Sequence, residues 1–519
     1  MQRVKKTSGL LLILLTIVWT ACGKPAYQDI VKTKEPLGHT YYVATNGNDA
    51  AGGSLKAPWQ SINNALAKAM AGDTILVRAG VYYEKISFTR SGIPGKPIVL
   101  KAFEGERPVI DGSRISVTGW EALVTMTNVQ YIVLDGFDIR NLTTPVKGAD
   151  PEGIVVNGNA RQITIQHCNI YNIKNTATLE NGRSGHAILV VGNGTQPITG
   201  VEIMGCTVHN TQTGTSENIT LAGNVDGFKI THNKVYDTEN IGIIIADGGG
   251  LNPGGSTATN FARNGVVSDN ELYNVSMANS TDIWGINNYG AIAIYICGGT
   301  NTVVERNRVY NCDRGIGLVS ENNAYPTKNV IVRNNFVYDN WRTGIYMGDY
   351  LNFTTAGTYD SYVVNNTLYR NNRTTGAFGE IEGEIRLTER CFNNVIRNNI
   401  IYAGPEDVFI HKYTTTGAGN IIDNNLYYTR GTPQWIWNSV DGASLKTMDD
   451  WKAASGSDAQ SVYGVDPLLL DLTVPDLHLQ AGSPARNAGV VIDASIHGLT
   501  DIDGKPRIVD NRISKGAQQ

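Results

Sequence analysis

Hydrophobic and polar positions recur along this chain in one phrase: an Asn, any residue, a hydrophobic residue and then a Tyr. The phrase begins at Asn233, Asn270, Asn307, Asn335, Asn366, Asn399 and Asn425. The steps between these Asn residues are 37, 37, 28, 31, 33 and 26 residues. A repeat of this length indicates one supersecondary unit that is stacked many times. The unequal steps predict inserted loops at some turns, on the side that usually forms a binding face.

A second predicted strand follows each phrase and opens with Gly. These strands are 242–247, 290–295, 315–320, 344–349 and 383–388, which gives two strands in each coil. Counted from the Gly as zero, the even positions are mostly apolar or small. Successive side chains of a strand point to opposite faces. We therefore predict that the even positions face the interior and that the odd positions face solvent.

The predicted organisation places the β-solenoid at 114–428, after an N-terminal cap with the first coils at 39–113 and before a C-terminal cap segment at 429–519. Within the first cap, Ser61 is predicted to start an amphipathic helix with Ile62, Ala65 and Leu66 on its apolar face. Such a helix covers the apolar interior that the terminal coil would otherwise expose. The fold class is therefore all-β, a parallel solenoid of about ten or more coils.

The repeated Asn and Tyr residues have a structural explanation. An Asn at the same turn of every coil is expected to form a ladder of amide hydrogen bonds, and the Tyr column, with His209 in one coil, to stack likewise. Cys168 and Cys206 occupy the Asn position in two preceding coils. Adjacent coils lie about 4.8 Å apart, so a disulfide is sterically conceivable. We interpret the two residues as inward-facing, buried thiols.

The first residues form a targeting segment. Positive residues precede an apolar stretch at 10–18 that is too short to span a bilayer. Thr20-Ala21-Cys22 resembles the bacterial lipobox, although Trp19 departs from its pattern. The resemblance implies a lipoprotein signal peptide at 1–22, lipidation of Cys22 and a tether at 23–38. Ordinary signal cleavage beside an incidental Cys is the alternative.

The net charge and the N-terminal segment indicate which kinds of binding partner to expect. The net charge of −4 and the pI of about 6.1 argue against nucleic acid as a partner. We expect a monomer in the bacterial cell envelope, lipid-anchored to the outer membrane and either periplasmic or surface-exposed. Contact with the membrane is expected only through the N-terminal anchor.

Several segments resemble a known group of proteins. Residues 41–49, 58–62, 71–75 and 80–82 look like the opening of bacterial right-handed parallel β-helix proteins of the pectate-lyase-like type. Residues 476–507 are similar to the C-terminal segment of many secreted members. The resemblance covers nearly the whole mature chain, and it implies a right-handed parallel β-helix and glycan processing. Members include polysaccharide lyases, glycosidases, epimerases and adhesins, so the fold alone does not fix the chemistry.

The catalytic motifs of particular members match poorly. Asn224-Val-Asp-Gly-Phe-Lys229 is superficially similar to the Asp-Gly-Phe motif of calcium-dependent family 9 pectate lyases, but Lys229 directly follows the Phe and the later Asp pair is missing. Glu382-Gly-Glu384 faintly resembles the paired metal-binding glutamates of chondroitinase-B-like lyases, but Glu389 stands where a basic residue is expected. The Asp-Pro-His motif of mannuronan epimerases is absent from the sequence.

The predicted register brings charged residues together. Glu321, Asp349, Glu384 and Arg386 fall on three consecutive coils, with neighbouring coils about 5 Å apart. Carboxylates about 5–5.5 Å apart suit a retaining glycosidase and those about 6.5–9.5 Å apart an inverting one. The alternative is a solubilising face on which Arg386 pairs with Glu384. The candidate substrate-binding residues are Asp247, Tyr295, Tyr346, Tyr350 and Lys412.

Three functions remain open. A glycosidase, which we favour narrowly, would use two of Glu321, Asp349 and Glu384 and no cofactor. A polysaccharide lyase acting on a uronate-containing, pectin- or alginate-like glycan would hold Ca²⁺ with these carboxylates, while Arg386, Lys412 or Tyr350 removes the C5 proton. A surface glycan binder or adhesin would do neither. His186 is a lone His that opens another second strand, and a structural role is its simpler interpretation.

Overall fold

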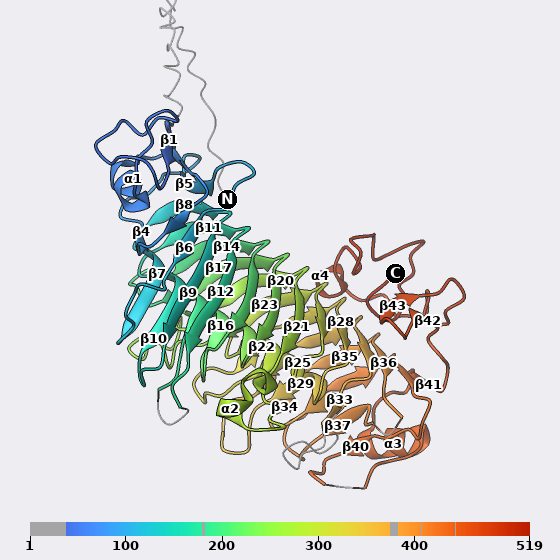
Figure 1. The fold of residues 1–519 in the computed structure, drawn as a ribbon. Coiled ribbons are helices and arrows are strands. Elements are labelled where there is room, and N and C mark those ends of the chain that lie inside the picture. The colour runs from blue at the N-terminus through green and yellow to red at the C-terminus, as the bar shows by residue number, and fades with distance from the viewer. Residues whose placement is uncertain (1–37, 179–181, 374–381, 406, 442) are drawn as a thin grey trace, which may run out of the picture. The chain divides into compact units, whose positions relative to one another are not determined.

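The computed structural model describes residues 38–519 except 179–181, 374–381, 406 and 442. The predicted signal peptide, Cys22 and the tether as far as residue 37 lie outside the described residues. The described part is a right-handed parallel β-helix in which three long sheets run side by side (Figure 1). Each coil contributes one strand to each sheet, so it has three strands and not the predicted two. The additional strand arises because the turn at the repeated Asn divides one predicted strand into two.

The sheets are named here by their size. The sixteen-stranded sheet contains β1 (Thr40–Val43), β2 (Thr74–Val77), β5 (Ile98–Ala102), β8 (Gln130–Asp135), β11 (Arg161–Gln166), β14 (Ile198–Met204), β17 (Val225–Thr231), β20 (Arg263–Ser268), β23 (Thr300–Glu305), β27 (Ile331–Arg333), β31 (Tyr362–Val364), β35 (Val395–Arg397), β38 (Ile421–Asp423) and the short side strands β26 (Thr327–Lys328), β30 (Thr358–Tyr359) and β34 (Cys391–Phe392). The thirteen-stranded sheet contains β3 (Val81–Tyr82), β6 (Val109–Asp111), β9 (Asp138–Thr144), β12 (Asn169–Asn175), β15 (Thr207–Thr211), β18 (Lys234–Thr238), β21 (Glu271–Val275), β24 (Arg308–Tyr310), β28 (Phe336–Tyr338), β32 (Thr367–Tyr369), β36 (Ile400–Tyr402), β39 (Leu426–Tyr428) and β41 (Val462–Tyr463). The twelve-stranded sheet contains β4 (Ile86–Ser87), β7 (Trp120–Thr127), β10 (Asp150–Asn157), β13 (His186–Gly192), β16 (Glu217–Gly223), β19 (Ile241–Ala246), β22 (Ile292–Cys297), β25 (Arg314–Val319), β29 (Thr343–Gly348), β33 (Gly383–Leu387), β37 (Ile410–Lys412) and β40 (Ile436–Trp437).

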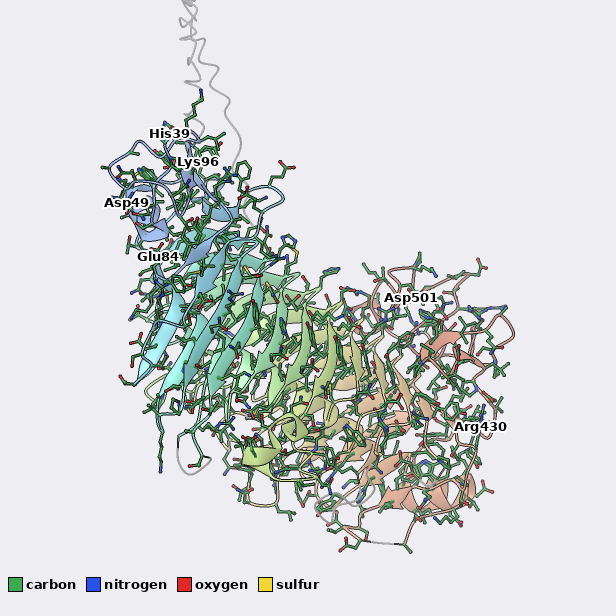
Figure 2. The ribbon with its side chains drawn as sticks, in the orientation of Figure 1. His39, Asp49, Glu84, Lys96, Arg430 and Asp501 are labelled. Carbon is green, nitrogen blue, oxygen red and sulfur yellow. The ribbon has the colours of Figure 1, made fainter. Side chains whose placement is uncertain are left out.

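The N-terminal helix forms as predicted. Helix α1 (Ile62–Lys68) begins after Ser61, whose hydroxyl accepts a hydrogen bond from the backbone N–H of Asn64. The carboxylate of Glu84 accepts the N–H groups of Ile62 and Asn63 at 2.7 and 3.1 Å. The first N–H groups of a helix have no partner within the helix, so Glu84 stabilises its start. Figure 2 labels Glu84 beside this helix.

The C-terminal segment lies along the outside of the coils. After β40 and β41 it forms α3 (Met448–Ser455), an antiparallel pair of β42 (Leu469–Asp471) and β43 (Asp476–Leu479), and α4 (Ala494–His497). Leu477 and Leu479 belong to an apolar cluster with Tyr402 of the thirteen-stranded sheet. A short loop before β22 holds η1 (Met277–Ser280) and α2 (Thr281–Trp284). Within the described residues, no helix has the length and apolar character needed to cross a membrane.

The predicted Asn ladder is confirmed. The side-chain amide of Asn233 donates to Oδ1 of Asn270 at 3.0 Å, and the same bond joins each later pair as far as Asn425 at 2.9–3.1 Å. Upstream, Cys206 donates its backbone N–H to Asn233, and both Cys168 and Cys206 are buried free thiols. The thiol interpretation is therefore confirmed, and no disulfide joins these two residues.

The aromatic column on the outside of the thirteen-stranded sheet is also confirmed. Rings stack from Tyr171 through His209 to Tyr338, with centroids 4.9–5.2 Å apart. The stacked rings from Tyr171 to Tyr338 and the Asn ladder from Asn233 to Asn425 recur from coil to coil, so they hold neighbouring coils in register.

Replacing Asn335 by Ala is expected to lower the free energy of unfolding by about 2–5 kcal/mol. The Asn335 amide accepts two hydrogen bonds from Asn307 and donates to Asn366, all of them buried. A buried donor left without a partner costs about 1–3 kcal/mol. Urea denaturation measures the loss. The control is Gln130→Ala, which removes an exposed bond to Arg161 and should change stability by no more than about 0.5 kcal/mol.

Candidate functional site

The strand register of the twelve-stranded sheet fixes which residues are level with one another. Ile292, Arg314, Thr343 and Gly383 pair in turn, so Glu384 is level with Gly344 of the preceding strand. The prediction took the first Gly of each strand as the common level. For β33 this choice is wrong by one residue, because Gly383 pairs with Thr343 and not with Gly344.

The predicted assignment of faces is also wrong for these strands. Ile243 and Ile245 belong to the interior core, whereas Ile244 belongs to a separate apolar cluster with Tyr295 and Tyr346 on the outer face. Both faces of the sheet are therefore apolar here. A strand that is buried on both faces reads as a continuous hydrophobic run, so alternation alone did not show which face was inside.

Glu384 points into the interior and not towards solvent, as does the next residue, Ile385. Its carboxylate accepts the backbone N–H and the side-chain amide of Asn371 at 2.8 and 2.6 Å. Asn371 in turn accepts the amide of Asn340, so Glu384 ends a second buried ladder. Burial first, and then the neighbouring Asp407, raise the pKa of Glu384 well above its usual range. Burial likewise raises the pKa of Asp407 to about 8. Glu384 is therefore a structural residue.

The buried acid pair predicts a pH-dependent stability. Because the folded-state pKa of Asp407 lies above the ordinary value of about 3.9, the folded protein keeps a proton that the unfolded chain releases. The free energy of unfolding should fall by up to about 1.4 kcal/mol per pH unit as the pH rises from about 4 to 8. Urea denaturation across this range tests it. Asp407→Asn should make stability depend less steeply on pH. The same pH dependence in the variant and the wild type would contradict a raised pKa of Asp407.

Arg386 does face outwards, as predicted, but its partner is Glu382. Arg314, Arg342 and Arg386 all bind Oε1 of Glu382, at 2.9, 2.5 and 2.9 Å. Burial alone would raise the pKa of Glu382, but these three guanidinium groups hold it well below its usual range. The predicted pairing of Arg386 with Glu384 is wrong. The cluster carries three positive charges and one negative charge under the outer surface.

A pocket of about 290 Å³ opens beside Arg386. Its lining residues are Asp349, Tyr350, Leu351, Asn352, Arg386, Thr388, Glu389 and Tyr413. Asp349 lies in it but is held by two bonds from Arg390, at 2.6 and 2.7 Å. The Arg386 guanidinium lies 4.5 Å from the ring centre of Tyr413. The structure thus brings the predicted residues Asp349, Tyr350 and Arg386 together.

The predicted aromatic subsites differ in their exposure. Tyr350 is 38% exposed, whereas Tyr295 and Tyr346 are 1% and 3% exposed. The two buried rings stack 6.2 Å apart across the intervening coil. A Cβ on Gly317 would lie within 2.6–2.8 Å of both rings, so only Gly fits between them. Of these three tyrosines, Tyr350 alone is substantially exposed.

Lys412 does not offer a free base. Its ammonium donates to the backbone carbonyls of Thr414 and Thr416 and lies 5.6 Å from the ring centre of Trp437. Burial lowers the pKa of Lys412, although Cys391 and Glu389 partly oppose this. The side chain is therefore held by the turn that follows β37.

Glu321 and Asp247 are the two predicted carboxylates that are not buried, and both have only neutral partners. Glu321 is exposed and accepts the hydroxyl of Tyr295 at 2.6 Å. Asp247 accepts the N–H of Gly249 at 2.7 Å and the amide of Asn322 at 3.3 Å. Burial raises the pKa of Asp247. Neither carboxylate forms an ion pair with any described residue.

A hydrogen bond links the segments that carry these two carboxylates. The Asn322 side chain, which donates to Asp247 at 3.3 Å, belongs to the residue directly after Glu321. Asp247 follows β19 and Glu321 follows β25, two coils further along. Strands two coils apart are separated by about 10 Å, and the register of these strands puts Asp247 level with Ser320, the residue before Glu321. Asp247 was predicted only to line a subsite.

Calcium does not fit the carboxylates predicted to hold it. Asp349 is bound by Arg390, Glu384 faces the interior, and Glu382 is surrounded by arginines. The segment that resembles the Asp-Gly-Phe motif is also occupied, because Asp226 pairs with Arg263 and Lys229 pairs with Glu202. Ca²⁺ is coordinated by several oxygens at once, and among the described residues Asp349, Glu384 and Glu382 are already held by other partners.

Comparisons with known proteins agree with this architecture. Residues 41–234 match a family model described as a Pel9A-like right-handed β-helix region, and residues 152–349 match a right-handed β-helix model. The uncharacterized protein YwoF of Bacillus subtilis is 32% identical over 463 residues, which cover 89% of this chain and 95% of YwoF. Pectate lyase PEL9 of Emericella nidulans is 39% identical over 95 residues, 18% of this chain and 23% of that protein.

A solved structure, XylC in complex with xylose, is 12% identical with a TM-score of 0.52 and covers 92% of this chain and 98% of XylC. That likeness shows the fold alone. The protein is therefore a right-handed parallel β-helix protein of the pectate-lyase-like type. Within this class, the chain belongs to the same family as YwoF. The sequence matches support a carbohydrate-active enzyme and leave its reaction class open.

Proposed function

We propose that this protein is a carbohydrate-active enzyme that hydrolyses glycosidic bonds with Asp247 and Glu321 as its two carboxylates. The observation that carries the proposal is that Asn322, the residue after Glu321, donates to Asp247, and that both carboxylates are bonded only to neutral donors. Carboxylates that are tied to arginines, such as Asp349, are poorly suited to exchange protons with a substrate.

The environments of the two carboxylates suggest different roles. A general acid must hold its proton near neutral pH, and partial burial raises the pKa of Asp247. Glu321 is exposed and is oriented by the Tyr295 hydroxyl, as a base that activates water should be. The strands that precede the two residues lie about 10 Å apart, which is near the carboxylate separation of about 6.5–9.5 Å that suits inverting glycosidases. We therefore assign Asp247 as the acid and Glu321 as the base.

The arginine cluster favours a glycan that contains acidic sugars. Arg386 lines the pocket next to the exposed ring of Tyr350, and the net positive charge around Glu382 lies beneath it. A guanidinium group binds the carboxylate of a uronate with matched geometry, and an exposed tyrosine ring packs against a sugar face. We propose this pocket as a subsite beside the bond that is cleaved.

A polysaccharide lyase is the second candidate. The matches to pectate lyase sequences favour it, as does the positive charge near Arg386, which would stabilise the anion formed when the C5 proton of a uronate is removed. Tyr350 and Arg386 would then be the residues closest to that proton. We propose no calcium ion for this reaction, because the carboxylates at this pocket do not fit one.

A glycan panel separates the three functions. Purified protein is incubated with neutral and uronate-containing polysaccharides, and both new reducing ends and ultraviolet absorbance of unsaturated sugars are followed. Hydrolysis gives reducing ends without absorbance, whereas a lyase gives both. Binding to a glycan without either signal would support a non-catalytic binder and would refute both enzyme proposals. A chelator is expected to leave the hydrolysis unchanged.

A further inference from the structure

A second group of ionisable residues lies on the outer face of the same sheet, several coils nearer the N-terminus. Glu152 of β10 pairs in register with His186 of β13. Ile188 pairs with Ile219, so Glu217 of β16 is level with His186. Asp150 lies two residues before Glu152 and therefore on the same face of β10. Four ionisable side chains from three consecutive coils thus meet at one place.

The geometry places donor atoms around a single point. Nδ1 of His186 lies 2.9 Å from Oε1 of Glu152, and Nε2 lies 3.6 Å from Oε2 of Glu217. Donor atoms of Asp150, Glu152 and His186 all lie within 4.8 Å of one another. Glu152 and His186 are buried, whereas Asp150 and Glu217 reach the surface in part. The group is therefore compact and has an open side.

A histidine–glutamate ion pair does not account for all of these atoms. The side chain of Glu152 is fully buried, yet its Oε2 has no hydrogen-bond partner among the described residues, and neither has Oδ1 of Asp150. Leaving a buried acceptor without a partner costs about 1–3 kcal/mol. Both free oxygens belong to residues of the donor group.

We propose that Asp150, Glu152 and His186 form a binding site for a divalent transition-metal ion of the Zn²⁺ or Mn²⁺ class. Two carboxylates and one imidazole suit such ions, whereas Ca²⁺ takes oxygen ligands. Nδ1 of His186 is the ligand atom, and its Nε2 faces the Glu217 carboxylate at 3.6 Å. A metal-bound His almost always donates its other N–H to such a partner, which fixes the ring orientation. Glu217 is therefore a positioning residue.

Metal content tests the site directly. The full chain is dialysed against Zn²⁺ and then against buffer, and its zinc content is measured by elemental mass spectrometry. The wild type is expected to retain about one zinc ion per chain. Asp150→Asn and Glu152→Gln should lower the affinity for Zn²⁺ at least about tenfold, and Glu217→Gln about tenfold. Ca²⁺ should not compete.

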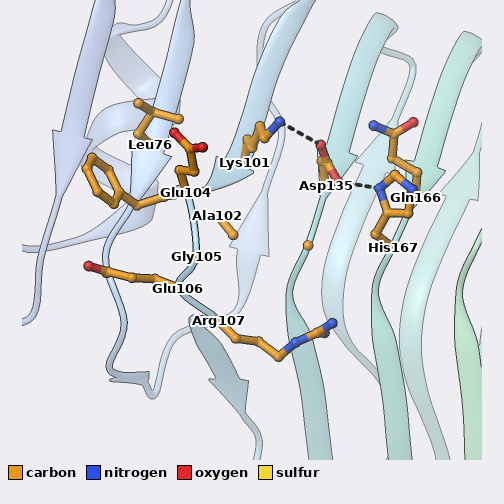
Figure 3. A pocket seen from close by; sticks show the side chains of 12 residues that line it. Leu76, Lys101, Ala102, Glu104, Gly105, Glu106, Arg107, Asp135, Gln166 and His167 are labelled. Carbon is orange, nitrogen blue, oxygen red and sulfur yellow. Dashed lines mark hydrogen bonds and ion pairs between the residues drawn. The ribbon is translucent and has the colours of Figure 1, made fainter.

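A matched control exists on another sheet. His167 lies 2.9 Å from Asp135, the same His–carboxylate distance, but the third partner there is Lys101 (Figure 3). His167→Gln should therefore keep the wild-type zinc content. Circular dichroism checks that each variant is folded. If Glu152→Gln does not fold, Asp150→Asn, which changes a partly exposed residue, still tests the site. Zinc binding that survives both substitutions, or no zinc in the wild type, would overturn the proposal.

Discussion

Replacing Glu321 by Gln is expected to lower kcat on the cleaved glycan by about 10²–10⁴-fold, the usual contribution of a positioned general base. Gln keeps the size of the side chain and can still accept the Tyr295 hydroxyl, but it cannot take a proton from water. Binding of the glycan should change little, because the substitution removes no charge pair. Initial rates and KM for the wild type and the variant measure the effect.

Asp247→Asn should cause a loss of similar size, and the double variant should lose little more. Two residues that act in one step are not additive, because either substitution alone stops the same reaction. The control is Glu121→Gln, which affects a carboxylate of the same sheet that pairs with Lys85 at the surface. Its kcat should equal that of the wild type. Retention of activity by both Asp247→Asn and Glu321→Gln would exclude the pair as catalytic residues.

Glu382→Gln is expected to have the largest effect on stability, a loss of about 3–5 kcal/mol in the free energy of unfolding. The substitution keeps the shape of the side chain but removes the counter-charge shared by Arg314, Arg342 and Arg386. Breaking a buried charge pair from one side leaves uncompensated charge in a medium of low polarity. Urea denaturation at neutral pH measures the difference.

An exposed ion pair provides the comparison. Glu271 pairs with Lys234 at 3.2 Å, and both side chains are about two-fifths exposed. Exposed pairs contribute only about 0–1 kcal/mol, so Glu271→Gln should lower stability by less than about 1 kcal/mol. Equal losses in Glu382→Gln and Glu271→Gln would show that Glu382 is not the counter-charge of the arginine cluster.

Much of the fold could be predicted because the repeat is visible in the sequence. The Asn ladder, the aromatic column and the buried thiols of Cys168 and Cys206 each occupy one level of the coil, so their spacing alone identified them. The third strand of each coil was missed because a single Asn turn such as Asn233 separates two strands without a clear break in hydrophobicity.

The site was harder to predict because it depends on register and on neighbouring coils. Gly383 appeared equivalent to Gly344 but is offset by one residue. Glu384 and the next residue, Ile385, also both face the interior, which strict alternation along a strand cannot predict. The partner of Asp349 is Arg390, which lies on the next coil after an inserted loop, so no fixed spacing connects them. His186 likewise looked isolated, because its carboxylate neighbours are 34 and 31 residues away.

Mass spectrometry of the products tests the central claim most directly. A uronate-containing oligosaccharide of known mass that the glycan panel identifies as a substrate is digested with the wild type and with Glu321→Gln. Hydrolysis by Asp247 and Glu321 predicts two saturated fragments whose masses sum to that of the substrate plus one water, and almost none with the variant. Fragments whose masses sum to that of the substrate alone, one of them unsaturated, would contradict hydrolysis and identify a lyase.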